Sequence, residues 1–194
     1  MEITSIQLKE LRDYTGISVM QCKKALEEAG GDMDKAKIIL QKKGGEIALK
    51  KSDRELGAGA IGSYVHSTHE VAALVQLSCE TDCVAKNQDF VALAREIAMH
   101  VAAQNPLYIQ RVEVSEEALQ KAKDVFKEEV KDKPAEMQEK ILAGKLDAYF
   151  KDRILMEQPF IKDQEKTISD LINTAIQKFG ENIVVTSVSR LSIK

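Results

Sequence analysis

The feature that most constrains this chain is the segment at residues 69–77, HEVAALVQL, which from Val71 onward is apolar at every position except Gln76. It follows a β-rich segment at residues 60–66 after a short polar interruption, a pattern that predicts a β-hairpin. Because the apolar side chains do not alternate with polar ones, we expect the second strand to lie centrally and to be covered on both faces. Residues 183–188 predict a closing strand. The chain therefore predicts an α+β fold, with an antiparallel sheet of about three strands and helices packed on it.

Residues 1–50 predict a compact module of three short helices. Small polar residues stand where helix N-caps are expected, and glycines stand where the helices are expected to end. The predicted caps and stops are, in chain order, Thr4, Gly16, Ser18, Gly30-Gly31, Asp32 and Gly44-Gly45. A charged, weakly patterned stretch follows, so we expect a linker at residues 51–57 and an α+β core at residues 58–194.

The core also predicts longer helical segments. One helix, at residues 90–103, is expected to end at Asn105-Pro106, and another is expected at residues 167–179. Between them, residues 115–155 contain two amphipathic segments separated by Lys131-Asp132-Lys133-Pro134. So short a connection predicts an antiparallel helical hairpin, and the narrow apolar face of each helix indicates that the hairpin projects from the core.

Composition argues against several classes of protein. With 28 Lys and Arg against 31 Asp and Glu, the net charge of −3 disfavours binding to nucleic acid through bulk positive charge. No apolar run reaches the roughly 20 residues that span a bilayer, and the first residues lack the pattern of a secretory signal. Cys22, Cys79 and Cys83 do not have the number or spacing of a disulfide framework or a zinc site. We therefore expect a cytoplasmic protein with no membrane span, metal or cofactor.

The sequence also lacks the motifs of the common enzyme classes. It contains no GxxxxGK[ST] or GxGxxG phosphate loop, no GxSxG nucleophile elbow and no HExxH metal site. One segment, from Cys79 to Asn87, mixes small, acidic and amide residues directly after the apolar strand. A loop at the end of a central strand is well placed to present side chains to a partner. A helix-capping role for Thr81 or Asp82 explains the same residues, so both interpretations stay open from the residues alone.

Two segments carry a resemblance to a known family. Residues 11–26 read LRDYTGISVMQCKKAL and residues 80–87 read ETDCVAKN, with shorter matches in family order at residues 62–66, 97–103, 157–160 and 180–183. Through this ordered set the chain resembles the elongation factor Ts family. The resemblance implies a non-enzymatic guanine nucleotide exchange factor in translation elongation. It also implies that a ubiquitin-associated-like module and an α+β core both bind elongation factor Tu, in its GDP-bound and nucleotide-free forms.

The resemblance further implies which residues contact that partner. In the family, positions in the module dock on the partner's nucleotide domain, and a core position helps to disturb its phosphate-binding loop. The loop after the apolar strand enters beside the nucleotide and its magnesium ion. The residues of this chain at the implied contact positions are Leu11, Met20, Lys23, Lys51, His66, Thr81, Asp82, Cys83 and Val84.

The chain departs from the family pattern in two ways. Cys83 stands where phenylalanine is usual, so no aromatic wedge is available at that position. Longer members duplicate the core, whereas this chain holds a single copy, as shorter members do. We therefore expect a homodimer, because a closed twofold pair is the commonest assembly and would restore a bipartite surface.

Three alternatives compete with this interpretation. The helical module and the core could form an adaptor for other partners. Cys79 and Cys83 could belong to a thiol or redox enzyme. An RNA-binding protein is the third alternative, which the net charge and the lack of aromatic residues on a basic strand disfavour.

Overall fold

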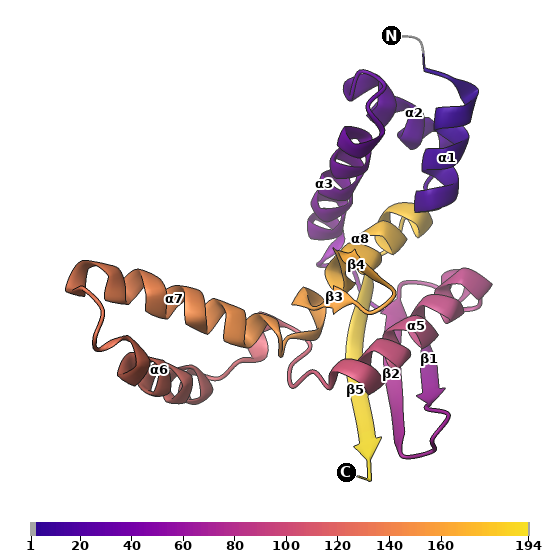
Figure 1. Cartoon of the computed structure of the whole chain (residues 1–194). Helices are drawn as coiled ribbons and strands as arrows, with labels where there is room; N and C mark the ends of the chain where they lie inside the picture. The colour runs from indigo at the N-terminus through magenta and orange to yellow at the C-terminus, as the bar shows by residue number, and fades with distance from the viewer. Residues whose placement is uncertain (1–2, 194) are drawn as a thin grey trace.

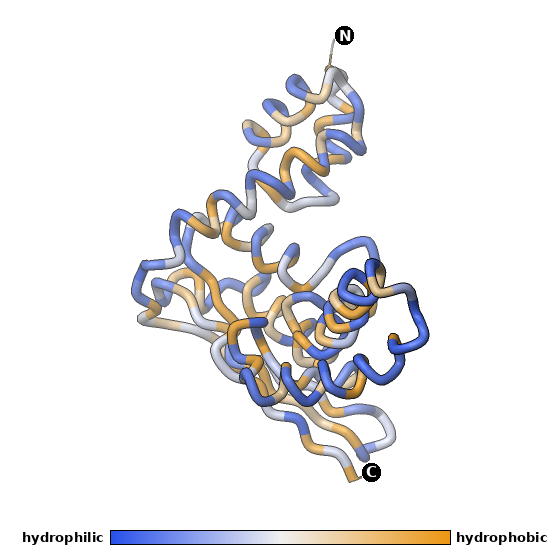
Figure 2. Tube along the Cα trace, turned by 90° about the vertical axis from the view of Figure 1, so that its left-hand side faces the viewer, coloured by the Kyte–Doolittle hydropathy of each residue, from blue (hydrophilic) through white to orange (hydrophobic). Residues whose placement is uncertain are grey.

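The computed structural model describes residues 3–193 and has the predicted α+β class. The two ends of the described chain lie at opposite ends of the molecule (Figure 2). Helices α1 (Ser5–Thr15), α2 (Val19–Glu28) and α3 (Met33–Lys51) come first. The remaining elements are β1 (Ala58–Val65), β2 (Val71–Cys79), α4 (Asp82–Ala85), α5 (Gln88–Gln104), η1 (Arg111–Glu113), α6 (Glu116–Val130), α7 (Ala135–Lys151), η2 (Leu155–Glu157), β3 (Pro159–Phe160), β4 (Asp163–Thr167), α8 (Ile168–Phe179) and β5 (Ile183–Ser192).

The three N-terminal helices begin where their caps predict. Thr4 and Asp32, for example, cap α1 and α3 through their side chains. The prediction that Gly44-Gly45 ends the third helix is wrong, because α3 continues to Lys51. Gly44 packs on α8, where an added Cβ would lie only 3.3 Å from the carbonyl oxygen of Asn173. The glycine thus allows two helices to approach closely, and this packing outweighs its low helix propensity.

Strand β2 is the central strand of a sheet ordered β1-β2-β5, and both neighbours are antiparallel to it. Helix α5 lies across one face (Figure 1), and Val75 and Leu77 of β2 are fully buried in the core there. On the other face, Ile61, Leu74 and Leu191 are 61%, 51% and 73% exposed. The prediction that β2 is covered on both faces is therefore wrong, because helices cover only one face of the sheet.

A second sheet, of two strands, pairs β3 with β4. No sequence pattern predicts it, since β3 has two residues and β4 reads DQEKT, without an apolar residue. Its strands lie beside α8, which follows β4 directly.

Helices α6 and α7 form an antiparallel hairpin that extends away from the sheet (Figure 1). Ala122 and Phe150 are buried where the two helices meet the body of the protein. Arg111 fixes this base: its Nε donates to Glu157 at 2.7 Å and its Nη2 to Asp147 at 2.9 Å. Within residues 3–193, no helix combines the length and the apolarity needed to cross a membrane.

Candidate protein-binding site

The segment between β2 and α5 carries four of the predicted site residues and lies at one end of the sheet. Asp82 and Cys83, on the first turn of α4, are exposed, and the Asp82 carboxylate pairs with the Lys86 ammonium at 3.1 Å. Val84 points the other way and is only 8% exposed, within the main core. The loop therefore presents a carboxylate and a thiol to solvent while an apolar side chain anchors it.

The carboxylate of Glu181, just before β5, holds this loop from below. It accepts hydrogen bonds from the N–H groups of Glu80 at 3.1 Å and Thr81 at 3.0 Å, and from the Thr81 hydroxyl at 2.5 Å. Hydrogen bonds to a charged acceptor are stronger than those between neutral groups. Thr81 stands at the N-cap position of α4, yet its side chain makes no capping bond. The Thr81 hydroxyl therefore bonds to Glu181 instead of capping α4.

A second set of bonds ties Glu80 to the linker. The Glu80 carboxylate accepts from the N–H of Asn182 at 2.6 Å and from Arg54 at 3.2 Å. These two donors, Asn182 first, hold the pKa of the Glu80 carboxyl below its ordinary value. Buried Asn182 also donates through its side chain to the carbonyl of Arg54 at 3.2 Å. The residue pattern of the sequence gives no sign of the roles of Glu181 and Asn182, and their only signal is the family match at residues 180–183.

Cys79, one of the two cysteines near the loop, is not placed for thiol chemistry. Cys79 is fully buried, and its thiol donates to the carbonyl of Thr81 at 3.3 Å. Burial raises the pKa of the Cys79 thiol, and the nearby Glu181 carboxylate raises it further. A thiol that stays protonated is a poor nucleophile. Among residues 3–193, no group of three or more His, Cys, Asp or Glu side chains is placed to hold a metal ion.

His66 lies at the opposite end of the sheet from Asp82. It is exposed in the turn after β1, and its Nδ1 accepts from the N–H of Thr68 at 3.3 Å. The β1–β2 pairing runs from Ala58 opposite Cys79 to Val65 opposite Ala72. At a rise of about 3.3 Å per residue, this separates the turn from the loop by about 25 Å. One copy of the chain therefore does not bring His66 and Asp82 together.

The four predicted residues of the N-terminal module fall into two pairs. Met20 is 69% exposed, and Lys23 is exposed one turn further along α2. Leu11 is completely buried in the core of the module, so the partner contact expected of its side chain is not available in this structure. Lys51 donates to the carbonyl of Gly180 at 2.6 Å and so joins α3 to the end of α8. Met20 and Lys23 are the members of this set that face solvent freely.

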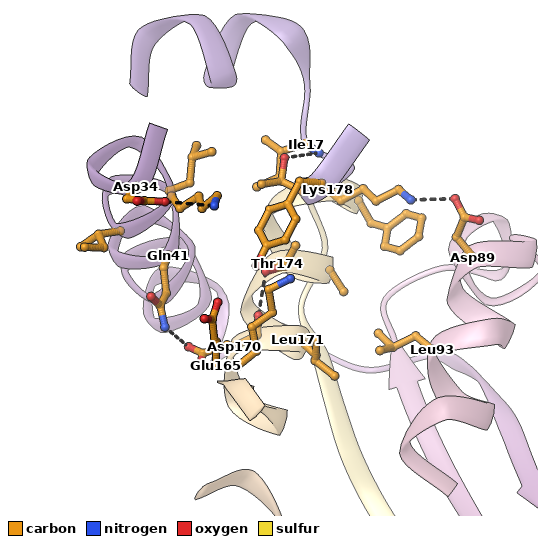
Figure 3. Close-up of a pocket in the computed structure, with 18 residues that line it drawn as sticks. Ile17, Asp34, Gln41, Asp89, Leu93, Glu165, Asp170, Leu171, Thr174 and Lys178 are labelled. Atoms are coloured by element: carbon orange, nitrogen blue, oxygen red, sulfur yellow. Dashed lines mark hydrogen bonds and ion pairs between the residues drawn. The ribbon is translucent and has the colours of Figure 1, made fainter. Parts of the chain in front are cut away.

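A hollow of about 580 Å³ lies between the module and the core (Figure 3). Gln41 of α3 donates to Asp170 of α8 at 2.7 Å, and Lys178 of α8 donates to Asp89 of α5 at 2.6 Å. Helix α8 thus connects the module to the helix that begins just after the loop. These polar side chains bond to one another across the hollow. We therefore interpret the hollow as an interface that fixes the module, which carries Met20, relative to the core, which carries Asp82.

An exposed loop with a fixed base, together with exposed Met20 and Lys23 on the module, forms a surface suited to docking on a partner protein. Comparison with known proteins gives the family. The sequence model of the family described as Elongation factor TS matches residues 18–193. Elongation factor Ts of Thermodesulfovibrio yellowstonii is 47% identical over 194 residues, which span 100% of this chain and 97% of that protein. Elongation factor Ts of Thermosipho melanesiensis is 46% identical over 193 residues, 98% of each chain.

A third relative, elongation factor Ts of Geotalea uraniireducens, is 43% identical over 195 residues, 100% of this chain and 90% of that protein. The chain therefore belongs to the elongation factor Ts family, as its motifs predicted.

Proposed function

We propose that the chain is a guanine nucleotide exchange factor that promotes GDP release from elongation factor Tu in the cytoplasm. Family membership supports a role in translation elongation. The observation that carries the proposal is the loop held by Glu181, which presents Asp82 and Cys83 on a fixed base. The acidic balance of the chain supports a protein, and not a nucleic acid, as its direct partner.

In the proposed mechanism, this chain and GDP compete for binding to elongation factor Tu. A factor that prefers nucleotide-free elongation factor Tu must weaken GDP binding by the same factor, because linkage is reciprocal. Inserting the Asp82 carboxylate beside the magnesium ion disturbs the ion's ligands. Displacing the phosphate-binding loop removes N–H donors to the β-phosphate. Cys83 is too small to act as a wedge, so charge and the position of α4 carry the effect. No covalent step is required of either protein.

A homodimer completes this surface. The uncovered sheet face carries Ile61, Val65 and Leu74, which are 61%, 60% and 51% exposed. The neighbouring residues on this face of β1, β2 and β5 are uncharged. Two rows across the three strands are Val65–Ala72–Leu191 and Ser63–Leu74–Ser189. Exposed apolar patches without charged residues are typical of interfaces between proteins. A second copy stacked there with its strands reversed brings its His66 toward the first copy's Asp82, which one copy alone does not do.

Release of a fluorescent GDP from elongation factor Tu tests the exchange activity. Substoichiometric wild-type chain is expected to accelerate release, and Asp82→Ala is expected to lose at least about tenfold of that acceleration, equivalent to about 1.4 kcal/mol of barrier. Asp132→Ala, at the exposed tip of the hairpin, is the matched control and should match wild type. No acceleration by wild-type chain would contradict the proposal.

Mixing two inactive variants tests the dimer. His66→Ala and Asp82→Ala homodimers each lack half of every shared site. Random exchange of subunits makes half of the dimers mixed, with one of two sites intact, so the mixture should recover about a quarter of wild-type activity. A mixture as inactive as either variant alone would contradict a site shared between two copies.

A further inference from the structure

A second hollow, of about 560 Å³, lies beside α5, and Lys86 is the one lining residue whose contacts have been described above. Tyr64 of β1 stands on one side of it, and Val91 and Met99 of α5 supply apolar surface. The charged side chains that line it are Lys86, Arg95, Glu96 and Lys162. Three cations against one carboxylate give the hollow a formal charge of +2, whereas the whole chain carries −3. The hollow is thus a positively charged site on a protein whose net charge is negative.

The three cations differ in what they bond. Lys162 donates to Glu96 at 2.7 Å, and Lys86 reaches out of the hollow to pair with Asp82 at 3.1 Å. Arg95 is exposed, and its side chain forms no ion pair or hydrogen bond within residues 3–193. A guanidinium presents a planar fork of donors that matches a carboxylate in two parallel hydrogen bonds. The hollow therefore has one unpaired group suited to an incoming anion.

We propose that this basic hollow binds a carboxylate side chain of elongation factor Tu, in a second contact beside the Asp82 loop. The inference rests on the proposed function and extends it. The apolar walls from Val91 and Met99 can contact the stem of an acidic side chain while Arg95 pairs with its carboxylate. A nucleic acid backbone needs a stripe of cations and meets repulsion from an acidic protein.

Lys86 connects this hollow to the loop. In the free chain its ammonium neutralises Asp82, with both side chains largely exposed, at 78% and 76%. A carboxylate that enters beside Arg95 attracts Lys86 as well, since both cations line the same space. The exposed Lys86–Asp82 pair is weak, so Lys86 can turn toward the incoming carboxylate at little cost.

The test compares Arg95→Glu with Lys140→Glu in the full-length chain. Both variants change the net charge by the same amount, and Lys140 is an exposed residue of the projecting hairpin. Affinity for nucleotide-free elongation factor Tu is measured by titration calorimetry. Arg95→Glu is expected to weaken binding about tenfold or more, and Lys140→Glu to change it less than about twofold. Arg95→Lys keeps the charge but loses the two parallel hydrogen bonds, so its affinity should lie between those of wild type and Arg95→Glu. Unfolding by urea should be unchanged in all three, which separates docking from folding.

Three results would overturn the inference. If wild type binds and exchanges nucleotide but Arg95→Glu matches Lys140→Glu, the hollow is not a contact, and the proposed function stands. If Arg95→Glu weakens binding to poly(U) RNA alone, the hollow serves RNA and not a protein carboxylate. If wild type does not bind elongation factor Tu, the proposed function and this inference both fail.

Discussion

The two ends of the β1–β2 sheet hold their exposed residues by different means. At the loop end, Glu181 and Asn182 bond to residues about a hundred positions earlier in the chain. At the turn end, His66 bonds within its own hairpin: the N–H of Thr68 donates to its ring, the N–H of His69 donates to its carbonyl at 2.8 Å, and its own N–H donates to the carbonyl of Val71 at 2.9 Å. The loop is thus fixed by the core, while the turn is set by local geometry. A change at Glu181 can therefore alter the loop without altering its exposed side chains, whereas the turn responds to changes within the hairpin itself.

The largest effect is expected from a change that damages both ends together. Gly62, at the middle of β1, faces α5, and an added Cβ would lie 2.1 Å from the carbonyl oxygen of Ala94. Gly62→Ala should lower the free energy of unfolding by about 3 kcal/mol or more, because helix and strand must separate. Equilibrium unfolding in urea measures it. Gly144→Ala is the matched control: nothing lies within 4 Å of its added Cβ, and it should be neutral or stabilising. Similar stabilities for the two variants would refute the close packing of β1 on α5.

Removing the loop anchor should affect the loop end of the sheet and leave the turn end unchanged. Glu181→Ala removes the acceptor of two N–H groups and of the Thr81 hydroxyl, at an expected cost of about 1 kcal/mol in the free energy of unfolding, because water can replace the acceptor at exposed Thr81. Stimulated GDP release should fall as well, although Glu181 itself is engaged below the loop. Glu181→Gln keeps one acceptor oxygen and should lie between wild type and alanine. Full exchange activity in Glu181→Ala would show that the loop needs no anchor.

A pH series tests a contact on α5 away from the loop. His100 is fully buried: its Nε2 lies 2.9 Å from the Gln158 side-chain oxygen, and its Nδ1 accepts from the N–H of Ile161 at 3.3 Å. Burial lowers the pKa of His100, although the bond to Gln158 opposes the shift. Unfolded histidine takes up a proton near pH 6.5, and the folded residue does so only at lower pH.

The stabilisation from neutral His100 is therefore complete above about pH 6.5 and declines as the pH falls below that value, by at most about 1.4 kcal/mol per pH unit. The free energy of unfolding of wild type minus that of His100→Gln, measured from about pH 8 to pH 5, isolates this group from the carboxylates. The difference should shrink toward acid pH. A difference that stays constant would mean that the folded protein accepts the proton freely.

The smallest effects on stability are expected at the exposed residues themselves. Asp82→Ala and His66→Ala should each change the free energy of unfolding by no more than about 0.5 kcal/mol, since neither side chain is buried. Each should nonetheless slow stimulated GDP release. Thermal unfolding measured beside exchange distinguishes this from Glu181→Ala, which should lose both. A large loss of stability in either variant would show that the residue has a structural role instead of a role in partner contact.

Local interactions explain what could be predicted from the sequence. The Thr4 and Asp32 caps act within a few residues, so their patterns predict where α1 and α3 begin. The end of α3 depends instead on the contact of Gly44 with α8, which no neighbouring residue reveals. Leu74 belongs to an apolar run, but the run does not tell which face a helix layer covers.

The same limit applies to the candidate site. The segment that holds Asp82 and Cys83 could be singled out from its motif, because the motif is local, and the contact of these residues with a partner stays a prediction. The motif does not predict which side of the loop each residue faces, because this depends on contacts with distant residues: Thr81 bonds to Glu181, and Val84 packs into the core. Leu11 likewise belongs to a matched segment but is a core residue of the module.

The most direct test of the central claim is a pair of affinities for the same chain. Its binding to elongation factor Tu is measured once without nucleotide and once with saturating GDP and magnesium. Exchange by competition predicts that GDP weakens binding about a hundredfold, and that the chain weakens GDP binding by the same factor. Equal affinities in the two conditions would contradict the account, because a factor that does not distinguish the two states cannot drive nucleotide release.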